Sequence, residues 1–226
     1  MGQDKRIRII VGHYGSGKTE FAVNYAIKLA KEKKKVALVD LDIVNLYFRS
    51  REKKDMLESL GIKVIGSNLE GRAADVPAIS PSVLLPLQDK SYEAILDVGG
   101  DDIGARTLGR YHSYFQKEDY DMFCVVNANR PETQDVYGVI KHIQAIQNIS
   151  RLSVTGLINN THLLRETTTQ DVLKGQQLIW QVSERLHIPI KYVSVLAEVA
   201  EKLPQGLEGE IFPIRLYMRE DWMDRS

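Results

Sequence analysis

Hydrophobic and polar residues follow two periodicities along the chain. Short apolar runs bounded by turn residues indicate buried strands, whereas longer stretches with apolar residues every three or four positions indicate amphipathic helices. The apolar runs predict strands at 7–11, 36–41, 62–65, 92–98, 121–128, 154–159 and 190–196. The alternation of Phe212, Ile214, Leu216 and Met218 predicts one more strand, and Pro213 places it at the edge of a sheet.

Helical patterns fall between most of these strands. They cover 20–31, 48–60, 102–115, 136–146 and 172–187, and a connection at 66–89 is expected to hold one short helix. Strands that alternate with helices from end to end predict a three-layer α/β/α fold, with a mostly parallel sheet and helices on both faces. The chain has 226 residues, of which 43% are hydrophobic. This length suits one large core, so a single domain over 1–226 is expected.

The charge balance and the cysteine content argue against some classes of protein. Lys and Arg number 30, Asp and Glu also number 30, and the formal net charge is zero. This balance argues against a general nucleic-acid-binding surface. The single cysteine, Cys124, lies in an apolar run and is expected in the core, as in proteins of reducing compartments. The polar N-terminus and the absence of a run long enough to span a membrane predict a cytoplasmic protein without membrane contacts.

The segment between the first strand and the first helix carries the strongest motif. It reads GHYGSGKT and fits the phosphate-binding pattern G-x-x-x-x-G-K-T. Its glycines allow the backbone to curl into a nest of N–H groups at the positive end of the following helix. Lys18 is expected to reach the β- and γ-phosphates, and the Thr19 hydroxyl to ligate Mg²⁺. The residues predicted to hold the nucleotide are Gly12, His13, Tyr14, Gly15, Ser16, Gly17, Lys18 and Thr19.

Three carboxylates end predicted strands beside this loop. Asp97 follows an apolar strand, which is the Walker B pattern, and begins a D-x-x-G turn that ends at Gly100. Asp40 and Asp42 flank one residue and therefore point to the same face of an extended backbone. We expect Asp40 and Asp97 to support Mg²⁺ together with Thr19. Asp42 is the candidate to position an attacking water, so that Lys18 and Asp42 are the predicted catalytic residues.

Taken together, these motifs resemble the MinD/ParA and CobQ/CobB class of P-loop proteins, which carry a deviant Walker A motif and belong to the SIMIBI group. The phosphate-binding loop corresponds to G-K-G-G-x-G-K-T of this class, and Asp40-Leu41-Asp42 to its D-x-D. The resemblance extends over roughly 6–200 and implies a P-loop NTPase fold with ATP and Mg²⁺ as cofactors. An asparagine that ends a later strand contacts adenine in this class. Here it corresponds to Asn159 or Asn160, and the resemblance does not choose between them.

Two features depart from this class. Its signature lysine, which reaches across a dimer to the partner's phosphates, is replaced by His13. A neutral imidazole supplies less charge, so a homodimer with a lysine acting in trans is left open. One of four arginines in predicted loops or near strand ends could supply that charge, and the alternative for each is a solvated surface position. They are Arg72, Arg106, Arg110 and Arg130, of which Arg130 is the first to test. The C-terminal residues mix charges and lack the basic amphipathic helix of MinD-like proteins, so membrane binding is not expected.

Three functions remain open at this stage. The first is an ATPase that works as a nucleotide-driven switch on a partner protein. The second is an enzyme similar to CobQ/CobB or dethiobiotin synthetase that activates a small carboxylic acid with ATP. The third is a regulatory module that binds a nucleotide without hydrolysing it. The guanine motif N-K-x-D is absent from the sequence, which favours ATP over GTP.

Overall fold

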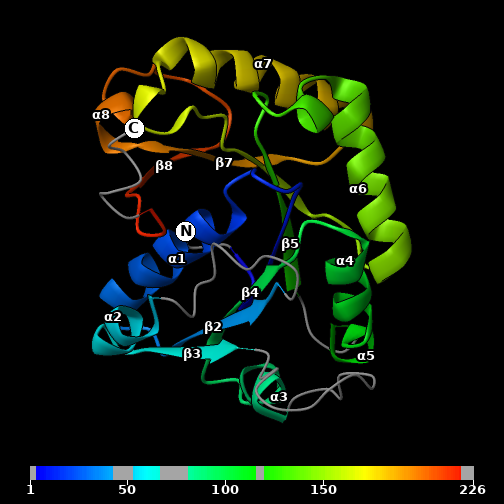
Figure 1. Ribbon diagram of the computed structural model, residues 1–226, viewed down its shortest axis with the longest axis vertical. Helices are drawn as coiled ribbons and strands as arrows, with labels where there is room; N and C mark the ends of the chain where they lie inside the picture. Colours follow the sequence, from blue (N-terminus) through cyan, green and yellow to red (C-terminus); the bar gives the residue numbers. More distant parts are fainter. Residues whose placement is uncertain (1–3, 43–52, 67–80, 116–119, 220–226) are drawn as a thin grey trace.

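The protein is a three-layer α/β/α molecule built around one parallel sheet (Figure 1). The computed structural model describes residues 4–42, 53–66, 81–115 and 120–219. Eight strands lie in the order β3-β2-β4-β1-β5-β6-β7-β8, and every neighbouring pair is parallel. The strands are β1 (Ile7–Val11), β2 (Val36–Leu41), β3 (Ile62–Gly66), β4 (Glu93–Val98), β5 (Tyr120–Val126), β6 (Gly156–Asn159), β7 (Ile190–Leu196) and β8 (Glu210–Ile214).

The helices follow the strands in the order that the sequence predicts. They are α1 (Lys18–Lys31), α2 (Lys54–Ser59), α3 (Pro81–Gln88), α4 (Asp102–Gly109), α5 (His112–Phe115), α6 (Val136–Ser150), α7 (Thr169–Leu186) and α8 (Ala197–Ala200). Short 3₁₀ turns, η2 (Pro131–Thr133) and η3 (Leu164–Glu166), precede α6 and α7. The predicted α/β class with a parallel sheet is confirmed.

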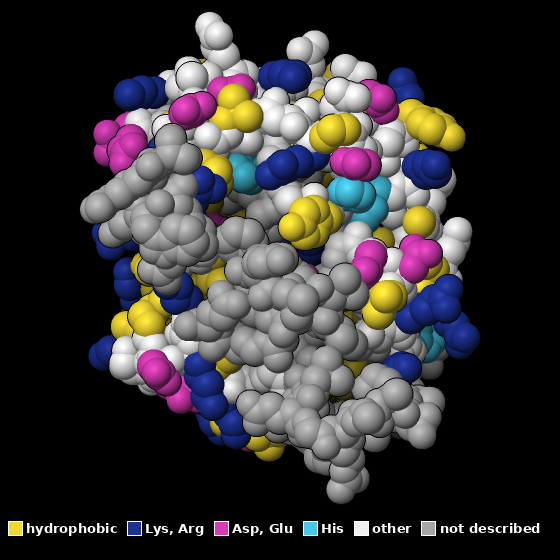
Figure 2. All heavy atoms as spheres, in the orientation of Figure 1, with side chains coloured by type: hydrophobic (Ala, Val, Ile, Leu, Met, Phe, Trp, Pro, Cys, Tyr) yellow, Lys and Arg dark blue, Asp and Glu magenta, His cyan; other side chains and the backbone are white. Residues whose placement is uncertain are grey.

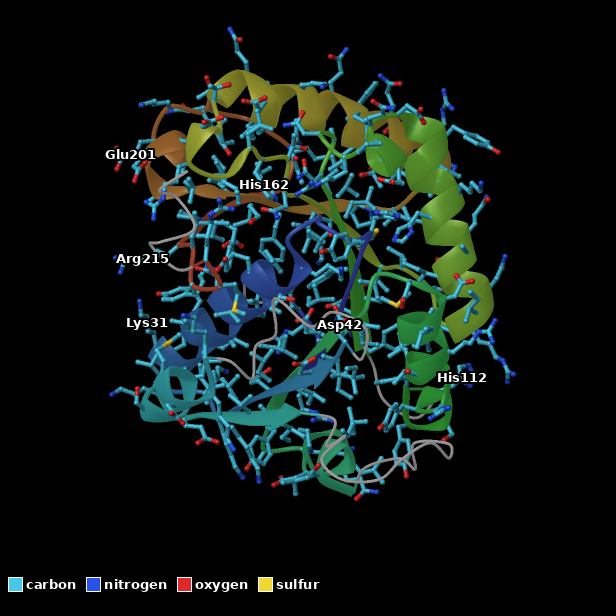
Figure 3. The ribbon with its side chains drawn as sticks, in the orientation of Figure 1. Lys31, Asp42, His112, His162, Glu201 and Arg215 are labelled. Atoms are coloured by element: carbon cyan, nitrogen blue, oxygen red, sulfur yellow. The ribbon has the colours of Figure 1, made fainter. Side chains whose placement is uncertain are left out.

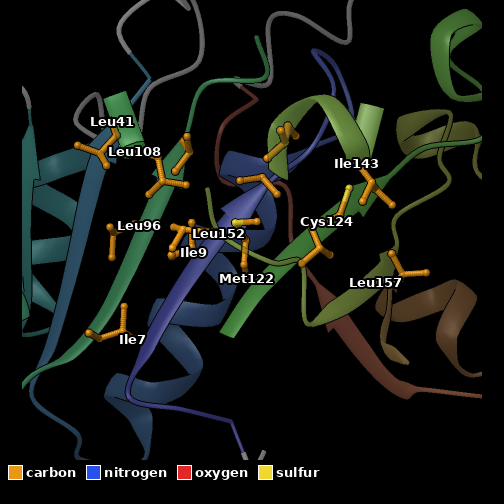
Figure 4. Close-up of a cluster of buried hydrophobic side chains, with 14 of the residues drawn as sticks. Ile7, Ile9, Leu41, Leu96, Leu108, Met122, Cys124, Ile143, Leu152 and Leu157 are labelled. Atoms are coloured by element: carbon orange, nitrogen blue, oxygen red, sulfur yellow. The ribbon is translucent and has the colours of Figure 1, made fainter. Parts of the chain in front are cut away.

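The core has two large apolar layers, one on each face of the sheet, and a smaller cluster between α7, β7 and α8. Helices α1 and α2 pack on one face, whereas α3, α4, α6 and α7 pack on the other (Figure 4). All five residues of the central strand β1 are buried, as expected for a strand covered on both faces. Cys124 is fully buried in the second layer, which confirms it as a core residue.

Several boundaries differ from the predicted ones. The predicted helix 102–115 is divided into α4 and α5 by a turn at Arg110 and Tyr111. Helix α1 begins at Lys18 rather than at residue 20, because the phosphate-binding loop itself starts the helix. Strand β8 ends at Ile214, so Leu216 and Met218 lie beyond it. The start of the predicted helix 48–60 and most of the 66–89 connection lie outside the described residues.

The segment after β8 is bound to helix α1. The Asn24 side chain exchanges two 2.8 Å hydrogen bonds with the backbone of Arg215. One turn earlier, Glu20 Oε1 accepts a 2.6 Å hydrogen bond from the Tyr217 N–H, and Glu20 Oε2 accepts a 3.1 Å hydrogen bond from the Met218 N–H. Since Glu20 directly follows the phosphate-binding loop, these bonds hold residues 215–218 beside that loop.

The described surface carries both signs of charge. On the face shown in Figure 2, Lys and Arg side chains are interspersed with Asp and Glu, and no large patch of one sign stands out among the described residues. None of the helices in the described ranges has the length and apolar character required to cross a membrane.

Candidate functional site

The sheet gathers the predicted site residues at the carboxyl ends of its central strands. Asp40 lies opposite Asp97 in the β2–β4 pairing, and Asp97 lies opposite Ile10 of β1. The loop after β1 and the residues that follow β6 open at the same edge (Figure 3). This edge is where open parallel sheets bind their ligands.

The loop at 12–19 adopts a conformation that requires glycine. Gly12, Gly15 and Gly17 have φ values of 148°, 74° and 86°, a region that other residues avoid. A Cβ on Gly12 would lie 2.3 Å from the Val125 carbonyl oxygen, and a Cβ on Gly17 would lie 2.2 Å from Asn160 Nδ2. Gly17 caps helix α1, so the loop presents its backbone N–H groups at the positive end of that helix.

The Lys18 side chain is buried inside this loop. Its Nζ donates a 3.3 Å hydrogen bond to the His13 carbonyl oxygen. Burial lowers the pKa of Lys18, while the carboxylates of Asp97 and Asp42 act in the opposite direction. A Cβ on Gly100 would lie 2.9 Å from Lys18 Nζ, so the D-x-x-G turn after β4 rests directly on the lysine.

The three predicted carboxylates are buried close to Lys18. Asp40, Asp42 and Asp97 are each at most 5% exposed. Burial and then repulsion from Asp40 raise the pKa of Asp97 to about 7, although Lys18 and the Thr19 hydroxyl favour its ionised form. Neither Asp97 carboxylate oxygen has a well-formed hydrogen bond to any described residue. Buried carboxylates in this state are typical of a site that a cation completes.

The donor set suits Mg²⁺ in the presence of a nucleotide. Within the described ranges, no three His, Cys, Asp or Glu side chains gather closely enough to hold a metal by themselves. Mg²⁺ usually takes only one or two protein ligands, because phosphate oxygens and waters fill its remaining positions. The Thr19 hydroxyl and the two nearby carboxylates, Asp40 and Asp97, are compatible with that arrangement.

A cavity of about 330 Å³ continues from the phosphate-binding loop towards β7 and the end of the chain. The loop and Thr19 line it together with Leu196, Leu216 and Met218. An apolar chamber beside a phosphate site has the form expected of a nucleotide pocket. The segment after β8, residues 215–218, which is hydrogen-bonded to helix α1, is therefore part of the pocket wall.

The structure separates the two asparagines that the sequence left undecided. Asn159 is fully buried beneath the cavity, where its Nδ2 donates 3.0 Å hydrogen bonds to the Val172 carbonyl and to Gln176 Oε1. Asn160 lines the cavity, and its Nδ2 donates a 2.7 Å hydrogen bond to the Ser16 carbonyl of the phosphate-binding loop. Of the two asparagines, Asn160 is therefore the one that lies against the cavity.

Alanine substitutions should separate the two roles. Asn159→Ala leaves the Val172 carbonyl and Gln176 without their donor, so we expect the free energy of unfolding to fall by about 2–3 kcal/mol. Asn160→Ala should change ATP affinity far more than stability. Urea unfolding and calorimetric titration of both variants measure the two quantities, and a loss of affinity confined to Asn159→Ala would contradict this assignment.

Among the predicted arginines that the structure describes, Arg130 is the one that reaches the loop. Its Nε donates a 3.0 Å hydrogen bond to the Gly15 carbonyl, and its side chain lines the cavity. Arg106 and Arg110 are exposed on α4 or at its end, and Arg72 lies outside the described residues. His13 is half-buried and contacts the His142 ring edge to face.

Some pocket residues were not predicted from the sequence. Ser194 and His162 line the cavity, as do Leu216 and Met218 after β8. His162 carried a usable signal, since it follows Asn160 by two residues at the end of a strand. The segment after β8 carried none, because its place depends on long-range hydrogen bonds to Glu20 and Asn24.

Solved structures share this fold. FtsY of Thermotoga maritima is 22% identical, with a TM-score of 0.55 over 85% of this chain and 62% of its own. Chloroplast FtsY of Physcomitrella patens is 18% identical, with a TM-score of 0.56 over 85% of this chain and 59% of its own. FtsY of Elizabethkingia anophelis in complex with GDP is 17% identical, with a TM-score of 0.55 over 85% of this chain and 58% of its own. The chain thus spans about three-fifths of these proteins, and at such identities the likeness concerns the fold alone.

Sequence comparisons identify the family to which the chain belongs. Among curated proteins, none matches the chain significantly. Residues 8–200 match the family described as the CobQ/CobB/MinD/ParA nucleotide binding domain, over almost the range that the motifs predict. Because that match covers most of the sequence and contains the phosphate-binding loop and all the strand-end carboxylates, the protein belongs to the CobQ/CobB/MinD/ParA family of nucleotide-binding domains.

Proposed function

We propose that the protein is a Mg²⁺-dependent ATPase that works as a nucleotide-driven switch on a partner protein. One observation carries this proposal: Lys18 and the buried carboxylates Asp42 and Asp97 meet at the phosphate-binding loop, which opens into the cavity. A site that only bound a nucleotide would not need several carboxylates buried beside its lysine, because burying a charge is costly.

Each residue has a role that follows from its place. The loop N–H groups and Lys18 bind the phosphates and stabilise the charge that develops during transfer. Bound Mg²⁺ would neutralise part of the phosphate charge, with Thr19 as ligand and Asp40 and Asp97 in support. Asp42 lies on the same edge and accepts a proton from, or orients, the attacking water.

The switch would use the turn at Gly99 and Gly100. A Cβ on Gly100 would lie 2.7 Å from the Gly12 carbonyl and 2.8 Å from the Tyr14 nitrogen, so this turn occupies the approach to the phosphate-binding loop. Helix α4 begins directly after it, capped by Asp101, which accepts a 2.9 Å hydrogen bond from Gly104. A terminal phosphate that displaces the turn would therefore move α4, where a partner could sense it.

The direct test is the release of phosphate from ATP by the purified protein. We expect turnover with Mg²⁺ and none after EDTA, because the carboxylates and Thr19 support the nucleotide only through the metal. ATP binding without any hydrolysis would instead favour the non-hydrolysing module. Turnover that requires an added small carboxylic acid would favour the acid-activating enzyme.

Arg130 is proposed to supply, within one chain, the positive charge that His13 does not. Arg130→Ala should lower kcat by about a hundredfold with little change in ATP affinity, since arginine fingers act mainly in the transition state. Arg130→Lys, which keeps the charge but loses the planar fork, should retain part of the rate. Turnover per molecule should be independent of protein concentration. An unchanged kcat in Arg130→Ala would overturn this role.

A further inference from the structure

The segment after β8, residues 215–218, covers part of the cavity without belonging to the sheet, and we call it the C-terminal strap. Strand β8 ends at Ile214, and the strap that follows forms neither a helix nor a strand. Leu216 and Met218 line the cavity together with Thr19. A wall outside the sheet can move without breaking the pairing between strands. The position of the strap therefore depends on its contacts with helix α1.

Asn24 holds the first residue of the strap. Its Oδ1 accepts a 2.8 Å hydrogen bond from the Arg215 N–H, and its Nδ2 donates a 2.8 Å hydrogen bond to the Arg215 carbonyl. The same Nδ2 donates a 2.8 Å hydrogen bond to the Glu20 carbonyl, so both of its protons are used. The Arg215 side chain is exposed at the edge of the molecule (Figure 3). Asn24 therefore binds the strap through its backbone.

Glu20 holds the other end of the strap. Its Oε1 accepts a 2.6 Å hydrogen bond from the Tyr217 N–H, and its Oε2 accepts a 3.1 Å hydrogen bond from the Met218 N–H. Asn24 and Glu20 are four residues apart and thus lie on one face of α1. The strap consequently runs along α1 towards the N-terminus of that helix, where the phosphates are expected to bind.

The two anchors place apolar side chains beside the phosphate site. Glu20 directly follows Thr19, and the Met218 backbone is bonded to Glu20. Tyr217 packs against the apolar layer that includes α1, while Leu216 lines the cavity. A nucleotide whose phosphates occupy the loop has to extend into this cavity, because its remaining atoms need an enclosing apolar wall. The strap would then lie against the nucleotide.

We propose that the C-terminal strap retains the bound nucleotide, and that Glu20 and Asn24 are positioning residues that hold the strap closed. Both anchors bind only the backbone of the strap, so they determine where it lies. Loss of an anchor opens one wall of the cavity, and the nucleotide leaves faster. This inference rests on the proposed function for the identity of the ligand, but it does not require hydrolysis.

The test measures how fast ADP leaves the full chain in the presence of Mg²⁺. The protein is loaded with ADP that carries the fluorescent N-methylanthraniloyl group, and an excess of unlabelled ADP is added in a stopped-flow instrument. We expect dissociation to be about tenfold faster in Glu20→Ala and in Asn24→Ala, since each variant loses hydrogen bonds that hold the strap closed. A purely structural defect would lower the fraction of protein that binds ADP, and thus the amplitude, but not change the rate.

Asn24→Ala is the decisive variant. Asn24 is 8% exposed and does not line the cavity, so its side chain can influence ADP only through the strap. Glu20→Gln keeps an acceptor for the Tyr217 N–H and should dissociate at a rate between those of the wild type and Glu20→Ala. It also covers a failure of Glu20→Ala to fold. Glu32→Ala, at the exposed C-terminal end of the same helix, is the matched control and should keep the wild-type rate.

Each contrary result has a distinct meaning. Wild-type dissociation rates in both Glu20→Ala and Asn24→Ala would overturn the inference and leave the proposed ATPase standing. A faster rate in Glu20→Ala alone would show that Glu20 acts on the nucleotide directly, and would likewise overturn it. Faster dissociation with the expected pattern, but without phosphate release from ATP, would support the strap and overturn the proposed hydrolysis. A failure of the wild type to bind ADP would overturn both proposals.

Discussion

Replacing Lys18 with alanine should lower kcat/KM for ATP by about a thousandfold or more. The side chain is buried in the phosphate-binding loop, where its charge is shielded from water and faces Asp97 and Asp42. A preorganised charge in a water-poor site contributes several kcal/mol to a phosphoryl-transfer transition state. Steady-state phosphate release from purified Lys18→Ala, compared with the wild type, measures this loss.

The same helix offers a matched control. Lys31 ends α1, thirteen residues after Lys18, and is exposed to solvent (Figure 3). Lys31→Ala removes the same charge and should leave turnover unchanged. Lys18→Ala should also stay folded, because burial disfavours the charge that it removes. Undiminished turnover in a folded Lys18→Ala protein would exclude the proposed hydrolysis at this site.

Replacing Asp97 with asparagine should stabilise the nucleotide-free protein while abolishing Mg²⁺-dependent turnover. Asp97 is 1% exposed, and burial together with Asp40 raises its pKa from the usual 3.8 to about 7. At pH 8 the ionised carboxylate therefore disfavours folding by up to about 4 kcal/mol. The amide introduced by Asp97→Asn has its own burial cost, so we expect a net gain of about 1–3 kcal/mol in the free energy of unfolding.

The sign of the pH dependence follows from that raised pKa. Below about pH 4 the carboxyl group is protonated in both the folded and the unfolded state, and its contribution to stability is fully present. This contribution is lost as the pH rises through about 7, because the unfolded chain ionises first. The advantage of Asp97→Asn should thus be large at pH 8 and smaller at pH 5.

Urea unfolding at both pH values measures this difference. Asp55→Asn, on the exposed surface of α2, is the control and should change stability little at either pH. A fall in stability of Asp97→Asn at pH 8 would show that the carboxylate is favourable in the nucleotide-free fold. The expected combination, greater stability with lost turnover, is typical of residues kept for chemistry at the cost of stability.

Hydrophobic periodicity and motifs predicted the fold because both are encoded by residues that lie close together in the sequence. The buried strands read as apolar runs, and the loop at 12–19 is recognisable by its glycines, Lys18 and Thr19. The carboxylates at 40, 42 and 97 were predictable because strand ends meet at one edge of a parallel sheet, and the structure places them there.

Other features depend on contacts that no local pattern encodes. The choice between Asn159 and Asn160 turns on which side chain faces the loop, and thus on hydrogen bonds to Ser16, Val172 and Gln176. The break between α4 and α5 was missed because apolar spacing continues across it.

The hydrogen bonds between helix α1 and the segment after β8 show which residues a functional fragment must include. The match to the family ends at residue 200, yet Leu216 and Met218 also line the cavity, on a segment that is hydrogen-bonded to helix α1. A fragment that ended at residue 200 would retain every motif but would lose Leu216 and Met218 from the cavity wall. A fragment can therefore contain all the motifs and still lack part of the cavity wall. A minimal functional unit has to extend through residues 215–218.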